Sequence, residues 1–115
     1  MPRDEGATRA FLIKAKKTLC EKHLVTFVPT SKTMQELAGL GLQVADVLRI
    51  IAKLEPRHWY SGPEADRNGS PGEVFVFMYP YSGVLMYIKL KACDMHDGTH
   101  LTILSFHEEG QHGRP

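Results

Sequence analysis

The fold is decided by residues 73–107, which read EVFVFMYPYSGVLMYIKLKACDMHDGTHLTILSFH. Three runs, EVFVFMY, VLMYIKLKA and HLTILSFH, are predicted to be strands, because turn signals at residues 80–83 and at Asp97-Gly98 separate them. The middle run alternates with the period of a strand that has one buried face. The alternation places Val84, Met86, Ile88 and Leu90 on one face, and Leu85, Tyr87, Lys89 and Lys91 on the other. The sequence therefore predicts a C-terminal antiparallel sheet with one polar face.

The apolar face of this sheet requires a cover, and the first upstream segment has a helical pattern. From about Thr8, the sequence TRAFLIKAKKTLCEK spaces Phe11, Ala15 and Leu19 by four residues, which makes one apolar stripe. The opposite side of this helix is basic and carries Arg9, Lys14, Lys16 and Lys17. Such a face suits either solvent or a polyanion, and both interpretations stay open.

Two further helices are expected before the sheet. The first starts at Ser31 or Thr33, where Thr33 and Glu36 fit a capping box, and ends at residues 39–41. The second, QVADVLRIIAKL, ends before Pro56 and is predicted to lie on the sheet. Its apolar face consists of Val44, Val47, Leu48, Ile51 and Leu54. Helices followed by antiparallel strands indicate an α+β fold, with N-terminal helices packed on the C-terminal sheet.

Three other parts of the chain have weaker patterns. HLVTFV, residues 23–28, fits an edge strand or an extended connector, and a connector is favoured because Pro29 follows. Residues 56–72 contain three prolines and three glycines and are expected to form a long functional loop, with Trp59 closing the edge of the core. The termini, residues 1–7 and 110–115, are expected to be disordered.

Length and composition predict one domain, residues 1–115, in the cytoplasm. No apolar run approaches the roughly 20 residues that a membrane helix requires, so no membrane partner is expected. Cys20 and Cys93 form no CxxC pair and are predicted to be free thiols in a reducing compartment. The net charge is only +1, but residues 1–32 carry seven basic and three acidic residues, a local charge of +4. A basic region of this kind can bind a polyanion.

A hairpin centred near His96 would bring the polar side chains of the last two strands together. In this register Lys91 lies opposite Leu101, Lys89 opposite Ile103 and Tyr87 opposite Ser105, while His107 falls beside Leu85. One face of the sheet then carries Tyr87, Lys89, Lys91 and His107. A shift of one residue would send His107 to the opposite face, so this cluster depends on the register.

The cluster has the groups that metal-independent RNA cleavage requires. One group removes the proton of the 2′-hydroxyl, another protonates the departing 5′-oxygen, and cations stabilise the charge that builds on the phosphate. The imidazole of His107 can act as acid or base at neutral pH, the phenol of Tyr87 can donate a proton, and Lys89 supplies charge. Tyrosine and lysine are also common on exposed strand faces, so an inert surface is the other interpretation.

Two further groups of residues compete with this site. Cys93, Asp94, His96 and His100 could all bind zinc, but their spacing matches no closed structural site and a polar hairpin turn explains them. We therefore expect no metal and no other cofactor. Glu64 and Asp66 could form a carboxylate pair for general base catalysis, although carboxylates in loops are usually only solvated.

Four stretches in order, GLGLQVADVLRIIAKL, WYSGPEADR, MYIKLK and ILSFHEE, resemble the MqsR family of toxin–antitoxin endoribonucleases over about residues 8–109. The resemblance implies a RelE-like α+β fold, messenger RNA cleavage without a metal, and neutralisation by a cognate antitoxin. It leaves open whether cleavage involves the ribosome. The tyrosine and lysine of the family's YxK strand motif fall on Tyr87 and Lys89, and the basic residue after the terminal SF falls on His107.

The sequence departs from the family at two outer positions of the site. Ser61 stands where some members have a lysine, and the glutamine that some carry in the first strand has no counterpart among Val74, Phe75 and Val76. The expected phosphate contacts are therefore Arg57, His58 and Arg67, with Lys91 beside them. Two other functions are open: an RNA-binding module of the same fold without turnover, and an interaction protein whose basic helix docks an acidic partner.

Overall fold

The computed structural model describes residues 4–27 and 30–109, which form an α+β fold. The elements in chain order are α1 (Glu5–Thr18), η1 (Lys22–Leu24), β1 (Val25–Phe27), α2 (Ser31–Gly39), α3 (Val44–Ala52), η2 (Pro56–His58), β2 (Trp59–Glu64), β3 (Glu73–Tyr81), β4 (Val84–Met95) and β5 (Gly98–Glu108). No helix among these residues is long and apolar enough to cross a membrane. Cys20 and Cys93 are free thiols, as the sequence predicts.

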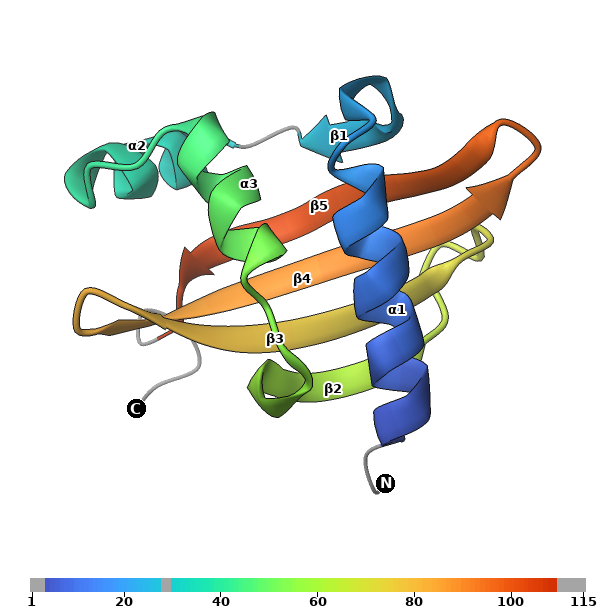
Figure 1. Ribbon diagram of the computed structural model, residues 1–115. Helices are drawn as coiled ribbons and strands as arrows, with labels where there is room; N and C mark the ends of the chain where they lie inside the picture. The colour runs from blue at the N-terminus through green and yellow to red at the C-terminus, as the bar shows by residue number, and fades with distance from the viewer. Residues whose placement is uncertain (1–3, 28–29, 110–115) are drawn as a thin grey trace.

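The sheet has five strands in the order β1-β5-β4-β3-β2, so β4 is its central strand (Figure 1). The three predicted strands are present and antiparallel, but the sheet is mixed, because β1 pairs parallel to β5. The favoured prediction of a connector at residues 23–28 is therefore wrong for Val25–Phe27. The predicted loop at residues 56–72 is also wrong in part, because Trp59–Glu64 pairs with β3.

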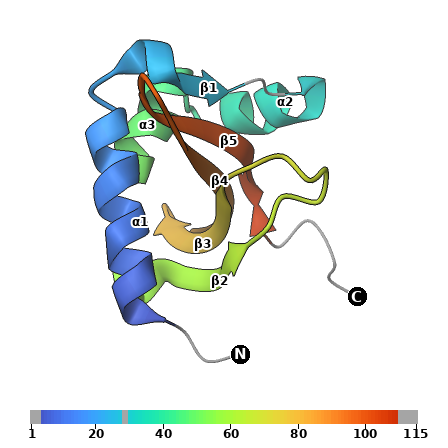
Figure 2. The ribbon, with the colours of Figure 1, turned by 90° about the vertical axis from the view of Figure 1, so that its right-hand side faces the viewer.

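Helices α1 and α3 lie across one face of the sheet, as predicted (Figures 1 and 2). Phe11 of α1 is fully buried, and its ring centroid lies 4.3 Å from that of Phe75 in β3. Val47 and Ile51 of α3 are also fully buried, whereas Val44 is 42% exposed and does not belong to the predicted apolar face. This packing fixes the helices on one side of the sheet and leaves the other side to the polar residues of β4.

Side-chain caps determine where α1 and α2 begin, and α2 spans Ser31–Gly39, within its predicted bounds. The carboxylate of Asp4 accepts a hydrogen bond from the backbone N–H of Ala7 at 3.0 Å, so α1 begins at Glu5 rather than near Thr8. The expectation of disorder through residue 7 is thus wrong for residues 4–7, and residues 1–3 and 110–115 lie outside the described range. In α2 the capping residue is Thr30 rather than Thr33. The backbone N–H of Thr33 donates to the Thr30 hydroxyl at 3.1 Å.

Gly62 allows β2 to lie close against β3. Its φ is +113°, and a Cβ at this position would lie 2.6 Å from the backbone oxygen of Val74. We expect Gly62→Ala to lower the free energy of unfolding by roughly 1–3 kcal/mol, because both the backbone conformation and the space exclude a side chain. Urea unfolding followed by circular dichroism measures this change.

Gly39→Ala is the matched control for this substitution. A Cβ at Gly39 meets nothing within 4 Å, and alanine is the better helix former. Its free energy of unfolding should be unchanged or slightly raised. Equal effects of the two substitutions would contradict the proposed constraint at Gly62.

Candidate active site

A β-bulge in β5 determines which side chains meet across the last two strands. From the hairpin turn inward, Met95 pairs with Gly98, Lys91 with Thr102 and Leu90 with Ile103, and the next pairing joins Lys89 to Ser105. Leu104 is an extra residue in β5, so the predicted register is wrong by one residue near the turn and by two residues beyond Leu104. Beyond this bulge Tyr87 pairs directly with His107, which restores the predicted common face.

Without the bulge, the two faces of β5 would be exchanged at its C-terminal end. Continuing the register of Lys91 and Thr102 would place Phe106 opposite Tyr87 on the polar face. Phe106 is instead 1% exposed in the core, opposite Ile88. The bulge accommodates the extra residue Leu104, and so keeps Phe106 in the core and His107 on the polar face.

The rings of Tyr87 and His107 stack on one another. Their centroids are 4.9 Å apart, and the angle between the ring planes is 12°. Nδ1 of His107 lies 3.2 Å from the backbone oxygen of Glu108. A carbonyl oxygen only accepts hydrogen bonds, so the neutral ring carries its proton on Nδ1 and its acceptor nitrogen is Nε2.

The phenol of Tyr87 is held in its protonated form. Burial raises the pKa of Tyr87 above its ordinary value, and the nearby Glu64 and Tyr60 raise it further, while Arg67 acts in the opposite direction. The phenol therefore keeps its proton at neutral pH and can donate it.

A pocket of about 270 Å³ lies next to this pair, between the sheet and the segment that joins β2 to β3. Figure 2 shows this segment folded over the face of the sheet opposite α1 and α3. Residues 64–68 form one wall of the pocket, and Val74, Lys89, Leu104 and Ser105 form the other. Lys89 and Arg67 form no ion pair with any other described residue, so both cations can contact a phosphate.

Lys91 and Asp66 anchor the segment over the sheet. Nζ of Lys91 lies 2.7 Å from Oδ2 of Asp66, and both side chains are about 15% exposed or less. Oδ1 of Asp66 accepts a hydrogen bond from the backbone N–H of Asn68 at 2.9 Å. Lys91 lies on the predicted face, but its ammonium already has a carboxylate partner, so its role here is to hold the wall of the pocket.

This ion pair should make stability depend on pH. The hydrogen bond from Lys91 lowers the pKa of Asp66, and the backbone hydrogen bond from Asn68 lowers it further. A carboxyl group with a lowered pKa stabilises the fold above its ordinary value of 3.8, and this contribution is lost as the pH falls through the lowered pKa. We expect Asp66→Asn to lower the Tm at neutral pH, and the difference from the wild type to shrink below about pH 4. Thermal unfolding over a pH series tests this, and a difference independent of pH would contradict it.

The structure does not bring Arg57 and His58 to this face. The ring of His58 is 7% exposed and packs edge-on against Tyr79, at a centroid distance of 5.0 Å, beside the helices. Its Nδ1 accepts a hydrogen bond from the backbone N–H of Glu55, and burial lowers its pKa, which keeps the ring neutral. Arg57 pairs with Glu55 at 2.6 Å. Arg57 and His58 therefore do not line the pocket. Of the three predicted phosphate contacts, only Arg67 lines it.

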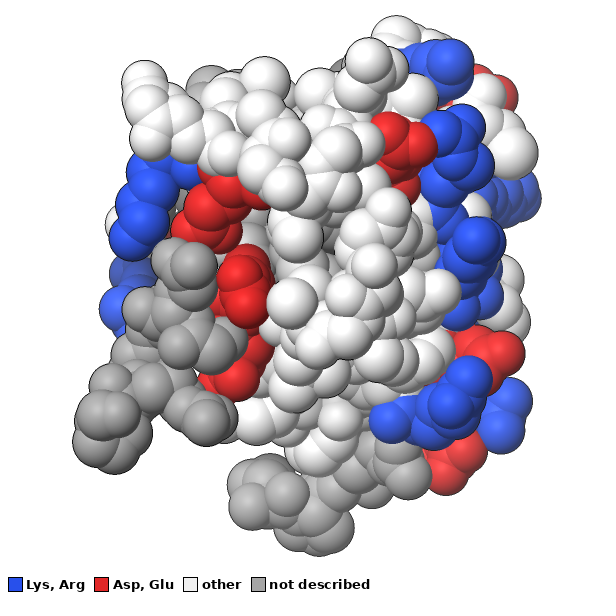
Figure 3. All heavy atoms as spheres, turned by 90° about the vertical axis from the view of Figure 1, so that its left-hand side faces the viewer, with Lys and Arg blue, Asp and Glu red and all other residues white. Residues whose placement is uncertain are grey.

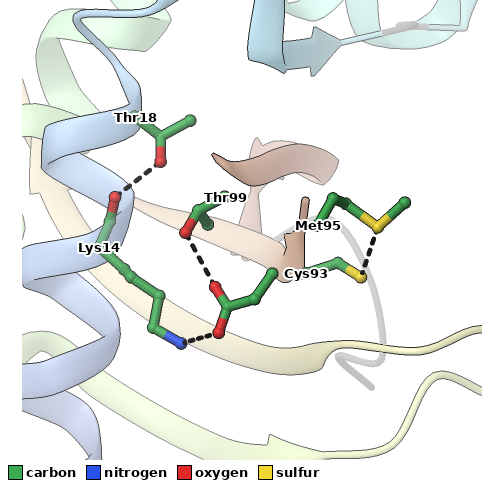
Figure 4. A network of polar contacts seen from close by, with 6 residues as sticks. Lys14, Thr18, Cys93, Met95 and Thr99 are labelled. Atoms are coloured by element: carbon green, nitrogen blue, oxygen red, sulfur yellow. Dashed lines mark hydrogen bonds and ion pairs between the residues drawn. The ribbon is translucent and has the colours of Figure 1, made fainter. Parts of the chain in front are cut away.

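The residues of the alternative zinc cluster have other partners. Asp94 accepts hydrogen bonds from Lys14 at 3.1 Å and from Thr99 at 2.8 Å, which ties α1 to the β4–β5 hairpin (Figure 4). His100 pairs with Asp97 at 2.8 Å. In the described part of the chain, no three His, Cys, Asp or Glu side chains are grouped so that they could hold a metal.

Lysine and arginine atoms occupy two separate bands in Figure 3, along opposite edges of that view. The band at the right lies on the helical side. It is separated from the band at the left by an uncharged surface and by acidic atoms that lie next to the left band. On α1 itself, Arg9 pairs with Glu5 and Lys14 with Asp94. The basic face of α1 therefore lies away from Tyr87 and His107, and it does not extend their pocket.

Comparison with known proteins finds no matching family model, curated protein or solved structure. The resemblance to the MqsR family, and the RelE-like fold that it implies, stay predictions.

Three residues that the sequence did not assign to the site lie in or beside the pocket. Ser105 faces Lys89 across the strands, and Glu64 and Tyr60 act on the pKa of Tyr87. The predicted carboxylate pair is divided, because Asp66 binds Lys91 while Glu64 stays exposed. Recognising β2 would have revealed Tyr60 and Glu64, since both belong to that strand.

Proposed function

We propose that this protein is an endoribonuclease that cleaves messenger RNA by metal-independent acid–base catalysis. The observation that carries the proposal is the stacked pair of Tyr87 and His107 beside a pocket with two cations, Lys89 and Arg67. The family resemblance extends the proposal to a growth-arresting toxin that a cognate antitoxin neutralises.

The two rings have complementary roles in this reaction. In its neutral form, Nε2 of His107 takes the proton of the ribose 2′-hydroxyl as the 2′-oxygen attacks phosphorus. The bond from phosphorus to the 5′-oxygen breaks, and the phenol of Tyr87 donates its proton to the departing oxygen. The phenol carries its proton at neutral pH, as a general acid must, and its raised pKa makes it a weaker acid than an ordinary tyrosine. The products are a 2′,3′-cyclic phosphate and a free 5′-hydroxyl.

The cations of the pocket stabilise the charge of the transition state. Negative charge builds on the non-bridging phosphate oxygens as the 2′-oxygen attacks, and donors that are already in place stabilise it. Lys89 and Arg67 approach the pocket from the sheet and from the covering segment, respectively. The guanidinium of Arg67 can hold two phosphate oxygens at once, whereas the ammonium of Lys89 acts as a point charge.

Incubation of the purified protein with a messenger RNA in the presence of EDTA tests the proposal. We expect cleavage to persist in the chelator and the new ends to be 2′,3′-cyclic phosphates and 5′-hydroxyls. His107→Ala should not cleave, while His23→Ala, a matched change at an exposed histidine, should cleave as the wild type does. If the RNA binds but stays intact, the protein is a binding module and not an enzyme.

Induced expression in a bacterial host tests the toxin role separately. Wild-type protein should arrest growth, and His107→Ala at equal soluble level should relieve the arrest. If the protein cleaves RNA in vitro but does not arrest growth, the nuclease proposal stands and the toxin proposal fails. Cleavage that appears only in a translating extract would make the ribosome a required partner.

A further inference from the structure

A second pocket, of about 450 Å³, opens next to the candidate active site. Its lining includes Asp4, Trp59, Tyr60, Pro63 and Glu64. Glu64 also lines the first pocket, so the two pockets are neighbours that share this residue. A group bound in the second pocket would therefore lie near a phosphate bound in the first.

The side chains of this pocket suit a flat ring. Tyr60 is 57% exposed, so its ring is accessible to a ligand. Trp59 is fixed by a hydrogen bond from its Nε1 to the backbone oxygen of Gly62 at 3.0 Å, and it packs against the core. Exposed aromatic rings in nucleic-acid-binding proteins stack on the bases of single strands.

The pocket is negatively charged, which disfavours a phosphate and favours the amino group on the edge of a base. Neither lysine nor arginine is among the described residues that line it, whereas Asp4 and Glu64 are both carboxylates. One oxygen of Asp4 accepts the N–H of Ala7, and a carboxylate has further lone pairs. Carboxylates accept hydrogen bonds from exocyclic amino groups, which cytosine, adenine and guanine have and uracil lacks.

We propose that this pocket binds a nucleobase of the RNA next to the cleaved phosphate, by stacking on Tyr60, and that Glu64 selects a base with an amino group. This inference rests on the proposed function for the identity of the ligand as RNA. Tyr60 lies close enough to Tyr87 to affect its pKa, so a base stacked on Tyr60 would lie near the catalytic pair.

Trp59 is the only tryptophan of the chain and lines the pocket, so its fluorescence reports binding directly. The probes are short 2′-O-methyl oligonucleotides, which cannot be cut because their 2′-oxygen is blocked. Tyr60→Ala should weaken their binding by on the order of tenfold, and Tyr60→Phe should retain it, because stacking requires only the ring. Ile13→Ala, an equally apolar truncation at a 69% exposed position of α1, should bind as the wild type does.

Base selection is tested by comparing oligocytidine with oligouridine. We expect tighter binding of oligocytidine by the wild type, and a smaller preference in Glu64→Gln, because an amide can also donate to the O4 of uracil. Equal binding of both oligonucleotides by the wild type would overturn the role of Glu64. Unchanged binding by Tyr60→Ala would overturn the base pocket.

The kinetics of cleavage separate this inference from the proposed function. Tyr60→Ala should raise KM, because Tyr60 contacts a base in the bound RNA. If the wild type cleaves RNA and Tyr60→Ala has an unchanged KM, the base pocket fails while the nuclease stands. If the wild type does not cleave, yet binding still depends on Tyr60, the nuclease fails while the base pocket stands.

Discussion

Tyr87→Phe is expected to lower the rate of RNA cleavage by at least about 100-fold, the usual loss when an acid–base group is removed. The substitution deletes one hydroxyl and leaves a ring that can still stack on His107. RNA affinity should therefore change little, and the loss should appear in kcat. Single-turnover cleavage with excess protein measures the chemical step separately from binding.

His107→Ala should lose a similar factor, because it removes the partner group of the same reaction. The double variant should then be only slightly slower than either single variant, since groups that act as a unit are not additive. Wild-type rates in Tyr87→Phe, with correctly folded protein, would falsify the assigned proton donor. A large loss in only one variant would leave a single acid–base group at the site.

Phe106→Ala is expected to have the largest effect on stability. The bulge at Leu104 places the ring of Phe106 in the core opposite Ile88, where it is 1% exposed, so its truncation leaves a cavity. Loss of a buried phenylalanine side chain from a core costs about 3–5 kcal/mol, and the substitution should lower the free energy of unfolding by a comparable amount. Urea unfolding measures the loss.

Leu104→Ala is the control for this substitution. It shortens a side chain of the same strand that is 42% exposed. Its free energy of unfolding should fall by less than about 1 kcal/mol, and cleavage should persist. An unfolding midpoint of Phe106→Ala equal to that of Leu104→Ala would show that the bulge does not place Phe106 in the core.

The main elements could be predicted from the sequence because their apolar periods are regular. Alternation in β4 and the stripe of α1 each put one set of side chains in the core, and the structure buries both sets except Val84 and Leu19, which are partly buried. β2 has no such regularity, because Gly62-Pro63 interrupts it and its register with β3 shifts twice. β1 has only three residues, too few for a period, and its parallel partner lies far along the chain.

The register of the last hairpin was wrong for a related reason. The turn alone does not determine pairing, and the bulge adds a residue that a regular pattern cannot contain. The sequence does hold a signal for it, because the buried residues of β5 are Leu101, Ile103 and Phe106, and their spacing changes from two to three. That change places the extra residue between Ile103 and Phe106.

The site residues that lie on a single strand could be predicted, whereas those that lie on connecting segments could not. Tyr87 and Lys89 share a face by alternation alone, and the structure places them together. Arg57 and His58 belong to η2, whose direction no local pattern specifies, and they lie on the helical side. Arg67 reaches the pocket because Asp66 holds the covering segment to Lys91, a pairing of residues 25 positions apart.

The order of the elements along the chain has a consequence for the synthesis of the protein. The ribosome completes α1 and α3 before any strand that they cover, so Phe11 and Ile51 have no sheet to pack against until β3, β4 and β5 follow. Nascent chains that expose apolar surface in this way are prone to aggregate and depend on prompt folding. Tyr87 also has no ring to stack on until β5 is made. A ribosome-bound chain that ends before β5 therefore lacks the assembled pair, and in the proposed function it cannot cut its own message during most of its translation.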